Sequence, residues 1–361
     1  MDDRVVRMLR RTAVLGTAAS AGALVAKLAE RAWRSATDPD GPDGLALPEG
    51  VERIVNTADG AELAVTDVAP SRDGRRGRHG EDAYVDTATI DDARRGSKRG
   101  RGRIAFGRRR APTIVLVHCF ACDRRTWAPV ARRLVAAGHR VVVYDQRGHG
   151  QSTLGTAAPT ASQLGDDLAT VIQQIGLHRT VVAGHSMGGF AAMAFACDHP
   201  DLLRDRVSGL VLVATAANGV GLRGLDPLAA WVLRSRALGW VMSQPRLGLM
   251  FTRATVGRRP VHAHLTAARD MFVATDAAVR AACFVGFSRS DHREGLAKVD
   301  VPTVVLVGDR DPLTPPRMAR AIVRTIPDAR LEVLPGAGHM LPLETPDRVA
   351  DVIGELAGDL S

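Results

Sequence analysis

The stretch that decides the fold is Thr180–Gly189, "TVVAGHSMGG", where a short apolar run passes directly into a run of small residues. Thr180–Ala183 has the composition of a buried strand, and Met187–Cys197 is spaced like a helix. Between them, Gly184-His185-Ser186-Met187-Gly188 fits the pattern G-x-S-x-G. A sharp strand-to-helix turn needs glycine two positions either side of the serine, and it lifts the hydroxyl to the helix N-terminus, where the dipole favours developing negative charge. This context predicts Ser186 as a nucleophile.

The same alternation of apolar strands and helices continues on both sides of this turn. A continuous β-branched run predicts a strand at Thr113–Val117, and short apolar segments in the same alternation predict strands at Arg140–Tyr144, Gly209–Val213, Thr303–Val307 and Leu331–Leu334. Helical spacing lies between them, near 126–137, 162–175, 316–326 and 346–357. Val51–Asn56 and Leu63–Val68 predict two more strands around the hairpin turn Ala58-Asp59-Gly60. Such a pattern predicts an α/β fold, a mostly parallel central sheet with helices on both faces.

Composition divides the chain into segments. Residues 35–50 are a Pro/Gly/Asp linker, and residues 51–358 carry the main domain. Within it, 70–110 is rich in Gly, Arg and Asp and predicts a disordered basic insertion. Residues 216–298 are strand-poor and rich in Leu, Ala, Met and Trp at helical spacing, which predicts an inserted helical cap.

Residues 1–34 combine arginines with the apolar, small-residue run "TAVLGTAASAGALVA". Three interpretations compete: a secretory or twin-arginine signal, a membrane anchor, or an Ala-rich helix on the protein or at a membrane surface. The run is shorter than the roughly 18 residues of a usual membrane span. We expect membrane association or export in preference to a cytoplasmic location.

The net charge of +9 comes from two peripheral segments. Residues 71–110 hold 13 Arg/Lys against 6 Asp/Glu, residues 1–34 hold 7 against 3, and the remainder sums to −2. The body therefore has no basic signature for nucleic acid, and none is expected as a partner, although 70–110 could contact anionic lipid or nucleic acid as a polybasic segment. Four cysteines in 361 residues do not make a disulfide framework.

A serine nucleophile needs a base that is oriented by a carboxylate. Strand 303–307 is followed by "GDRDPLTP" and strand 331–334 by "PGAGH", so both segments lie past the carboxyl ends of strands, where an open α/β sheet places its chemistry. His339 is the predicted base and Asp311 its predicted partner, with Asp309 as the competing acid. No cofactor or metal is expected, since His262 and His264 have no third ligand at metal spacing.

These motifs resemble the α/β-hydrolase superfamily. The segment 184–188 is similar to its nucleophile elbow, "GDRDPLTP" to its acid loop and "PGAGH" to its histidine loop. "DQRGHGQS" (145–152) resembles a loop of the cap-bearing esterase, lipase and haloperoxidase-like members, and serine at the elbow separates the chain from the members that carry aspartate there. The resemblance covers about 51–69 and 111–358, with the cap only loosely alike.

The resemblance also implies an oxyanion hole, formed by the backbone N–H groups of Phe120 and Met187. Cys119 stands where the family usually has glycine, in the segment "HCFACDR" (118–124). Its C-x-x-C spacing would also suit a redox dithiol or half a zinc site, but there is no second cysteine pair. We expect structural roles for Trp127 and His185, and likewise for three polar residues of the 145–152 loop, Asp145, Arg147 and His149.

Together these features predict a Ser-His-Asp hydrolase that cleaves a small carboxylic ester or a lipid-like acyl substrate through an acyl-enzyme. A perhydrolase of the cofactor-free haloperoxidase type, a C–C bond hydrolase and an acyltransferase can all use the same triad. A membrane-associated binding protein on this fold is the non-enzymatic alternative.

Overall fold

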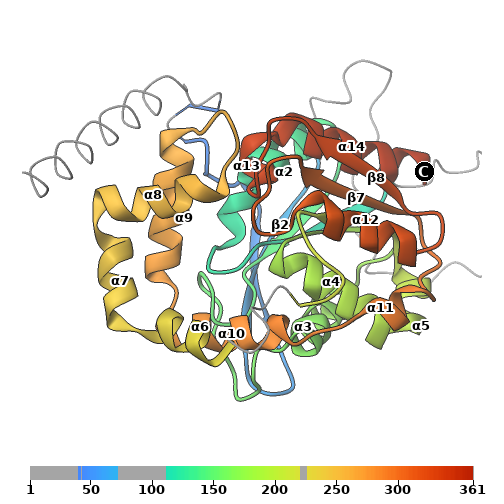
Figure 1. Cartoon of the computed structure of the whole chain (residues 1–361). Coiled ribbons are helices and arrows are strands. Elements are labelled where there is room, and N and C mark those ends of the chain that lie inside the picture. The colour runs from blue at the N-terminus through green and yellow to red at the C-terminus, as the bar shows by residue number, and fades with distance from the viewer. Residues whose placement is uncertain (1–39, 42, 72–110, 220–225, 361) are drawn as a thin grey trace, which may run out of the picture.

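The computed structural model describes residues 40–41, 43–71, 111–219 and 226–360 (Figure 1). The predictions for residues 1–34, and for nearly all of the basic insertion 70–110, fall outside these ranges. No single helix in the described ranges is long and apolar enough to cross a bilayer; α9 (His262–Ala274) and α10 (Ala277–Ser288), which are bent by 99° relative to each other, meet that test only as a pair.

An eight-stranded sheet forms the centre of the described part, in the order β1-β2-β4-β3-β5-β6-β7-β8. β1 and β2 pair antiparallel, β2 pairs antiparallel with β4, and the other neighbours are parallel. The strands are β1 (Val51–Asn56), β2 (Glu62–Val68), β3 (Thr113–Val117), β4 (Val141–Tyr144), β5 (Thr180–His185), β6 (Val207–Val213), β7 (Thr303–Gly308) and β8 (Arg330–Leu334). The predicted mostly parallel sheet is confirmed.

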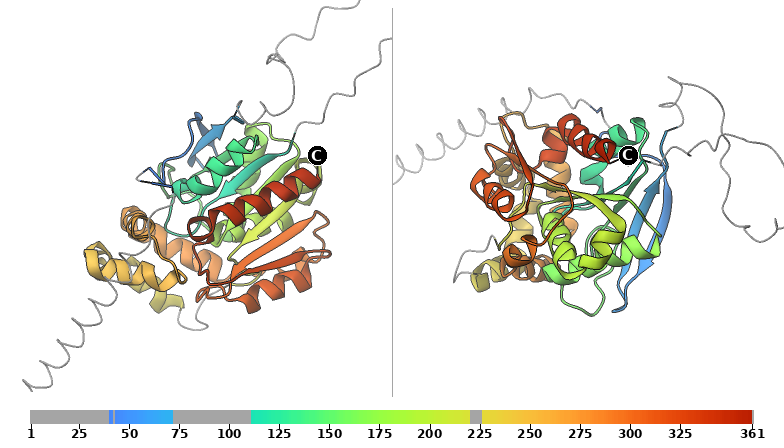
Figure 2. Two further views of the ribbon diagram at one scale, coloured as in Figure 1. Left: turned by 90° about the horizontal axis from the view of Figure 1, so that it is seen from above. Right: turned by 90° about the vertical axis from the view of Figure 1, so that its right-hand side faces the viewer.

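Helices cover both faces of the central part of the sheet, and the side chains of each strand alternate between the two faces. In β3, Ile114 and Leu116 join the hydrophobic core under α2 (Ala128–Ala136) and α14 (Pro346–Asp359). Val115 and Val117 point the other way, into a core with α3, α4 and α12. Figure 2 shows α2 and α14 side by side across one face of the sheet. The helices of the second face are α3 (Ala161–Gln174), α4 (Met187–Asp198) and α12 (Pro316–Thr325).

The predicted cap region lies between β6 and β7, and its described residues form helices and loops with one isolated bridge, between Asn218 and Asp291. The helices are α6 (Asp226–Arg234), α7 (Arg236–Ser243), α8 (Pro245–Thr255), α9, α10 and α11 (Arg293–Leu296). α10 reaches the body, since its residues Val279, Cys283 and Phe287 belong to the core on the α4 face. α6, α7 and α8 lie at the outer edge of the molecule, away from the sheet (Figure 1).

Three short elements were not anticipated from the sequence. A 3-10 turn, η2 (Arg124–Trp127), precedes α2; α5 (Pro200–Arg206) leads into β6; and α13 (Leu341–Glu344) follows the histidine loop. Each is seven residues or shorter, so it carries too little periodicity to be recognised.

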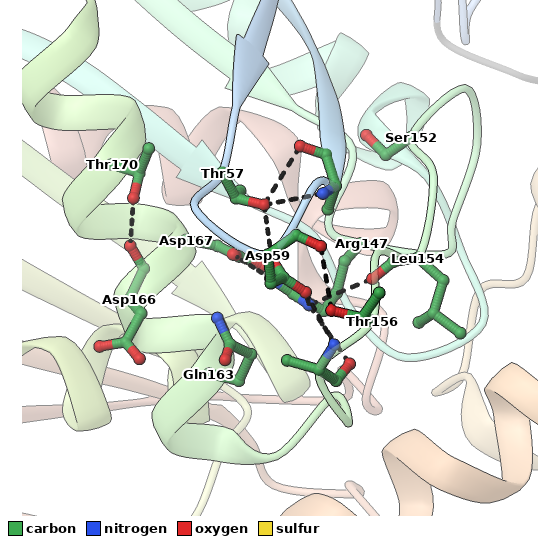
Figure 3. Close-up of polar contacts among 12 residues, drawn as sticks. Thr57, Asp59, Arg147, Ser152, Leu154, Thr156, Gln163, Asp166, Asp167 and Thr170 are labelled. Atoms are coloured by element: carbon green, nitrogen blue, oxygen red, sulfur yellow. Dashed lines mark hydrogen bonds and ion pairs between the residues drawn. The ribbon is translucent and has the colours of Figure 1, made fainter.

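Arg147 joins three elements through buried hydrogen bonds (Figure 3). Its guanidinium donates to both carboxylate oxygens of Asp167 on α3, each at 2.6 Å, and to those of Asp59 in the β1–β2 turn, at 2.8 and 3.1 Å. It also donates to the carbonyls of Leu154 and Ala157. The hydrogen bonds from Arg147 hold the pKa of Asp59 far below its ordinary value, whereas burial raises the pKa of Asp167. Arg147 therefore fastens the 145–152 loop to the hairpin and to α3.

Replacing Arg147 with methionine should lower the free energy of unfolding by about 3–5 kcal/mol, because it leaves the buried carboxylate of Asp167 and the half-buried carboxylate of Asp59 without their cation. Urea unfolding followed by circular dichroism measures this change. Arg204→Met is the matched control: its partner Asp201 is exposed, so the loss should not exceed about 1 kcal/mol. Equal effects of the two substitutions would contradict a structural role for the Arg147 network.

Candidate active site

The turn between β5 and α4 holds Ser186 in a strained conformation, with φ 52° and ψ −109°. Left-handed backbone is costly for a non-glycine residue and persists only where its surroundings impose it. Here the Ser186 amide donates to the carbonyl of Val213 at 2.9 Å, and the hydroxyl of Thr215 donates to the Ser186 carbonyl at 2.9 Å. The peptide groups on both sides of the Ser186 Cα are thus fixed by hydrogen bonds, which hold the strained conformation in place.

The two glycines of the motif are required by close backbone approach. A Cβ at Gly184 would collide with the carbonyl oxygen of Gly188, inside the turn itself. A Cβ at Gly188 would collide with the carbonyl oxygen of Val117 at the end of β3. The spacing G-x-S-x-G therefore permits both the tight turn and the contact between the turn and β3.

Ser186, His339 and Asp311 come together at the carboxyl ends of β5, β8 and β7. The Ser186 Oγ lies 3.0 Å from His339 Nε2, and His339 Nδ1 lies 2.9 Å from Asp311 Oδ2. A carboxylate oxygen can only accept, so Nδ1 carries the proton and Nε2 is left to accept the serine hydroxyl. The imidazole and the carboxylate are buried, whereas Ser186 is partly exposed. A reactant can therefore reach the serine but not the acid.

Asp311 is ionised at neutral pH. Burial opposes its ionisation, but interaction with His339 and hydrogen bonds from Thr314 outweigh burial and lower the pKa of Asp311 to about 2. Its Oδ1 accepts from the amides of Leu313 and Thr314, and its Oδ2 accepts from the Thr314 hydroxyl at 2.7 Å. The competing Asp309 instead accepts from the amide of Gly336 at 2.7 Å. Asp311 is thus the carboxylate that contacts His339.

Of the two amides predicted for an oxyanion hole, one belongs to the residue after Ser186 and the other to the loop after the neighbouring strand. Met187 is the first residue of α4, and Phe120 follows β3, the neighbour of β5. Across the described ranges, no acceptor takes a hydrogen bond from either amide. An oxyanion hole requires N–H donors that are not already engaged in the fold.

The loop after β3 is clamped by the loop after β4. His118 Nε2 accepts from the Gln146 amide at 2.9 Å, and the Gln146 side chain donates to the His118 carbonyl at 2.6 Å. Burial lowers the pKa of His149 to about 3, so its ring is neutral. Its Nδ1 donates to the Arg147 carbonyl, which leaves Nε2 to accept from the Ala121 amide at 3.3 Å. These bonds position the turn that contains the Phe120 amide.

Cys119 fits a position that usually takes glycine because its backbone is not left-handed. The positive φ of this turn is at Ala121, with 51°. The Cys119 side chain is buried in a small apolar cluster beneath the cap, together with Cys122, Met271, Met340 and Leu343. Both thiols are free, and the described residues offer no group of three or more His, Cys, Asp or Glu side chains that could hold a metal ion.

His185 and Trp127 support the site from below. His185 Nε2 donates to the His339 carbonyl at 2.8 Å, and the Trp127 ring stands edge-on to His185 with the centroids 6.3 Å apart. Trp127 is fully buried. His185 therefore holds the histidine loop in addition to its place in the elbow.

Glu344, Thr314 and Gln146 were missed by the sequence analysis. Glu344 accepts from the amides of Gly338 and Met340, on either side of His339, and from the amide of Gly257 between α8 and α9. Thr314 could have been noted, since it lies three residues after Asp311 in the acid loop. Nothing in the sequence around Glu344 marks it, because its partners are backbone groups.

Comparisons with known proteins agree on one kind of protein. The family model described as "Serine aminopeptidase, S33" matches residues 108–346. A protein of Caulobacter sp. (strain K31) named as the carbamate hydrolase RutD is 30% identical over 260 residues, which cover 68% of this chain and 91% of that protein. The non-heme chloroperoxidase CPO-A1 of Kitasatospora aureofaciens is 28% identical over 249 residues, covering 65% and 87%. The structure of a thermophilic esterase from Thermogutta terrifontis aligns with a TM-score of 0.65 and 27% identity, over 87% of this chain and 99% of the esterase.

Proposed function

The chain belongs to the S33 family of α/β hydrolases and is an α/β-fold hydrolase, and from this premise we propose that it is a serine hydrolase acting through Ser186, His339 and Asp311. The observation that carries the proposal is the pair of contacts made by the His339 ring, 3.0 Å to the Ser186 hydroxyl and 2.9 Å to the Asp311 carboxylate. The strained backbone of Ser186 supports it, since such strain concentrates at functional residues.

In the proposed reaction, the Ser186 Oγ attacks an acyl carbonyl while His339 Nε2 takes the hydroxyl proton. The carbonyl oxygen becomes negative and accepts hydrogen bonds from the Phe120 and Met187 amides. His339 then returns the proton to the leaving group, and Asp311 stabilises the imidazolium that exists between these two transfers. Water, deprotonated by the same imidazole, cleaves the acyl-enzyme and restores the serine.

The substrate class that we favour is a carboxylic ester or a lipid-like acyl compound. Phe120 contributes an aromatic ring beside its own amide, in edge contact with Phe287 of α10 at 5.5 Å between centroids. Phe190 and Phe284 pack against the same Phe287 ring. Phe190 and Phe287 are buried in the core, whereas Phe120 is only partly buried. The Phe120 ring, which carries the proposed oxyanion amide, would favour an apolar acyl or alcohol group over a charged one.

A fluorophosphonate reagent tests the proposal, because its phosphorus mimics an acyl carbon and forms a stable bond with an activated serine. We expect one phosphonyl group per folded chain, located on the peptide containing Ser186 by mass spectrometry. Protein unfolded in urea should not be labelled, because the triad exists only in the fold. Absence of labelling in the folded chain, or labelling of another serine, would contradict the proposal.

A perhydrolase is the second candidate, favoured by the similarity to a chloroperoxidase that needs no haem. In that reaction hydrogen peroxide in place of water would attack the acyl-enzyme and release a peracid. A chain-length series of p-nitrophenyl esters, run with and without peroxide and with peracid trapped, separates the two outcomes and orders the acyl lengths.

A further inference from the structure

The outer helices of the cap expose an unusual set of large apolar side chains. Trp231 is 68% exposed and Trp240 is 61% exposed, although tryptophan is on average among the well-buried residues. We define the cap face as six residues of α6, α7 and α8, namely Leu228, Trp231, Trp240, Leu247, Met250 and Phe251. Large apolar side chains exposed together on neighbouring helices are typical of an interaction site.

The spacing of the cap face within each helix is regular. Leu228 and Trp231 are three residues apart on α6, and Leu247 and Phe251 are four apart on α8, so each pair shares one side of its helix. α6 contains no buried residue at all, and the buried residues of α8 are Gly248 and Leu249, which separate Leu247 from Met250. The apolar stripes therefore face outward, and the helices are not hiding them against the body.

The charge on the same helices has one sign. Residues 226–259 contain six arginines and one acidic residue, Asp226, which is only partly exposed. Arg234 lies three residues after Trp231, and Arg236 lies four residues before Trp240. Helical spacing thus places arginine beside tryptophan on α6 and on α7.

We propose that the cap face docks on the surface of an anionic lipid bilayer. Tryptophan prefers the membrane–water interface, and exposed apolar stripes flanked by arginine are the composition of helices that lie in that interface. Two other occupants fit the charge poorly. A second copy of the chain would bring two sets of the same arginines together. Residues 1–34 have a net charge of +4 and would be repelled by those arginines. The inference goes beyond the proposed chemistry and does not depend on the triad.

Co-sedimentation of the full chain with large unilamellar vesicles tests this inference. We expect the chain to sediment with phosphatidylcholine vesicles that contain phosphatidylglycerol and to remain largely in solution with phosphatidylcholine alone. The combined substitutions Trp231→Ser, Trp240→Ser and Phe251→Ser should lower the partition coefficient at least about tenfold. Combining Arg234→Gln, Arg236→Gln and Arg246→Gln should lower it on the order of a hundredfold at low salt, since each basic residue near an anionic surface contributes about fivefold.

Tryptophan fluorescence locates the contact. The chain has four tryptophans, of which Trp127 is fully buried, so in a Trp33→Phe background Trp231 and Trp240 report on the cap. Anionic vesicles should shift their emission to shorter wavelength. Circular dichroism melting curves of all variants, compared with the wild type, separate lost docking from lost folding.

Three results would overturn the inference. One is that the triple aromatic variant, folded like the wild type, sediments as the wild type does, which would assign binding to another part such as residues 1–34. Another is that the wild type does not distinguish anionic from neutral vesicles. The third is that light scattering shows a dimer that the aromatic substitutions dissociate, which would make a second copy the occupant.

Discussion

Replacing Ser186 with alanine should reduce turnover of a p-nitrophenyl ester by about 10⁵–10⁶-fold, the loss typical when the nucleophile of a triad is removed. The side chain forms the new bond to the acyl carbon in the proposed reaction, and no described group replaces it at 3.0 Å from His339 Nε2. The substitution removes one oxygen from a partly exposed position, so we expect the fold and its melting temperature to be unchanged. Steady-state kinetics and a thermal melt on the same preparation measure both.

Ser162→Ala provides the control for this substitution. Ser162 lies on α3, and its hydroxyl donates to the exposed carboxylate of Asp198 at 2.6 Å, so it has no contact with the His339 ring. The Ser162→Ala substitution should leave turnover within about twofold of the wild type. If Ser186→Ala retains turnover within tenfold of the wild type, Ser186 is not the nucleophile. The chain would then have the family fold but use a different chemistry.

The central strands of the sheet were predictable because they are buried on both faces. A strand in that position must be apolar at successive residues, and runs such as Thr113–Val117 and Thr303–Val307 show this directly. The edge strand β8 is only partly buried and is less uniformly apolar. It was found instead from its turn signals and from its place in the alternation of strands and helices. The observed strand ends differ from the predicted ones by a few residues at most.

The elbow turn and the proximity of Ser186, His339 and Asp311 were predictable because their constraints are local. Gly184 and Gly188 are demanded by the turn around a single serine, and Asp311 and His339 each follow a strand whose carboxyl end faces the same edge. The competition between Asp309 and Asp311 could not be resolved from the sequence, because both lie in one loop. The structure separates them by their partners, the Gly336 amide and the His339 ring.

The support of the site was not predictable, because it depends on contacts between segments distant in the chain. Glu344 joins the histidine loop to Gly257 of the cap region, 87 residues away, and His149 reaches the Ala121 amide 28 residues away. Backbone amides leave no trace in the residue types around them. The arrangement of the cap helices was not predictable either, because apolar spacing predicts a helix but not which of its sides is covered.

Replacing Asp311 with asparagine should reduce ester turnover by about 10⁴-fold with little change in KM. Asparagine retains the size of the side chain but presents an NH₂ group as readily as an oxygen. If that NH₂ group faces His339, the ring takes the tautomer with its proton on Nε2, which cannot accept the Ser186 proton. The loss of negative charge also leaves the imidazolium of the reaction without its counter-ion. Because the pKa of Asp311 is lowered to about 2, the wild-type carboxylate is ionised throughout the neutral range, and the deficit should persist from pH 6 to pH 9.

Asp309→Asn is the matched control, two residues away in the same loop. Its Oδ1 accepts from the Gly336 amide, and an asparagine side-chain oxygen can accept the same bond, so turnover should fall by less than about tenfold. Fluorophosphonate labelling rates should follow the same order, slow for Asp311→Asn and near normal for Asp309→Asn, since labelling needs only activation of the serine. If instead Asp309→Asn shows the larger deficit in both assays, Asp309 orients His339 during the reaction, and the acid loop must rearrange from the state in which Asp311 lies 2.9 Å from the ring.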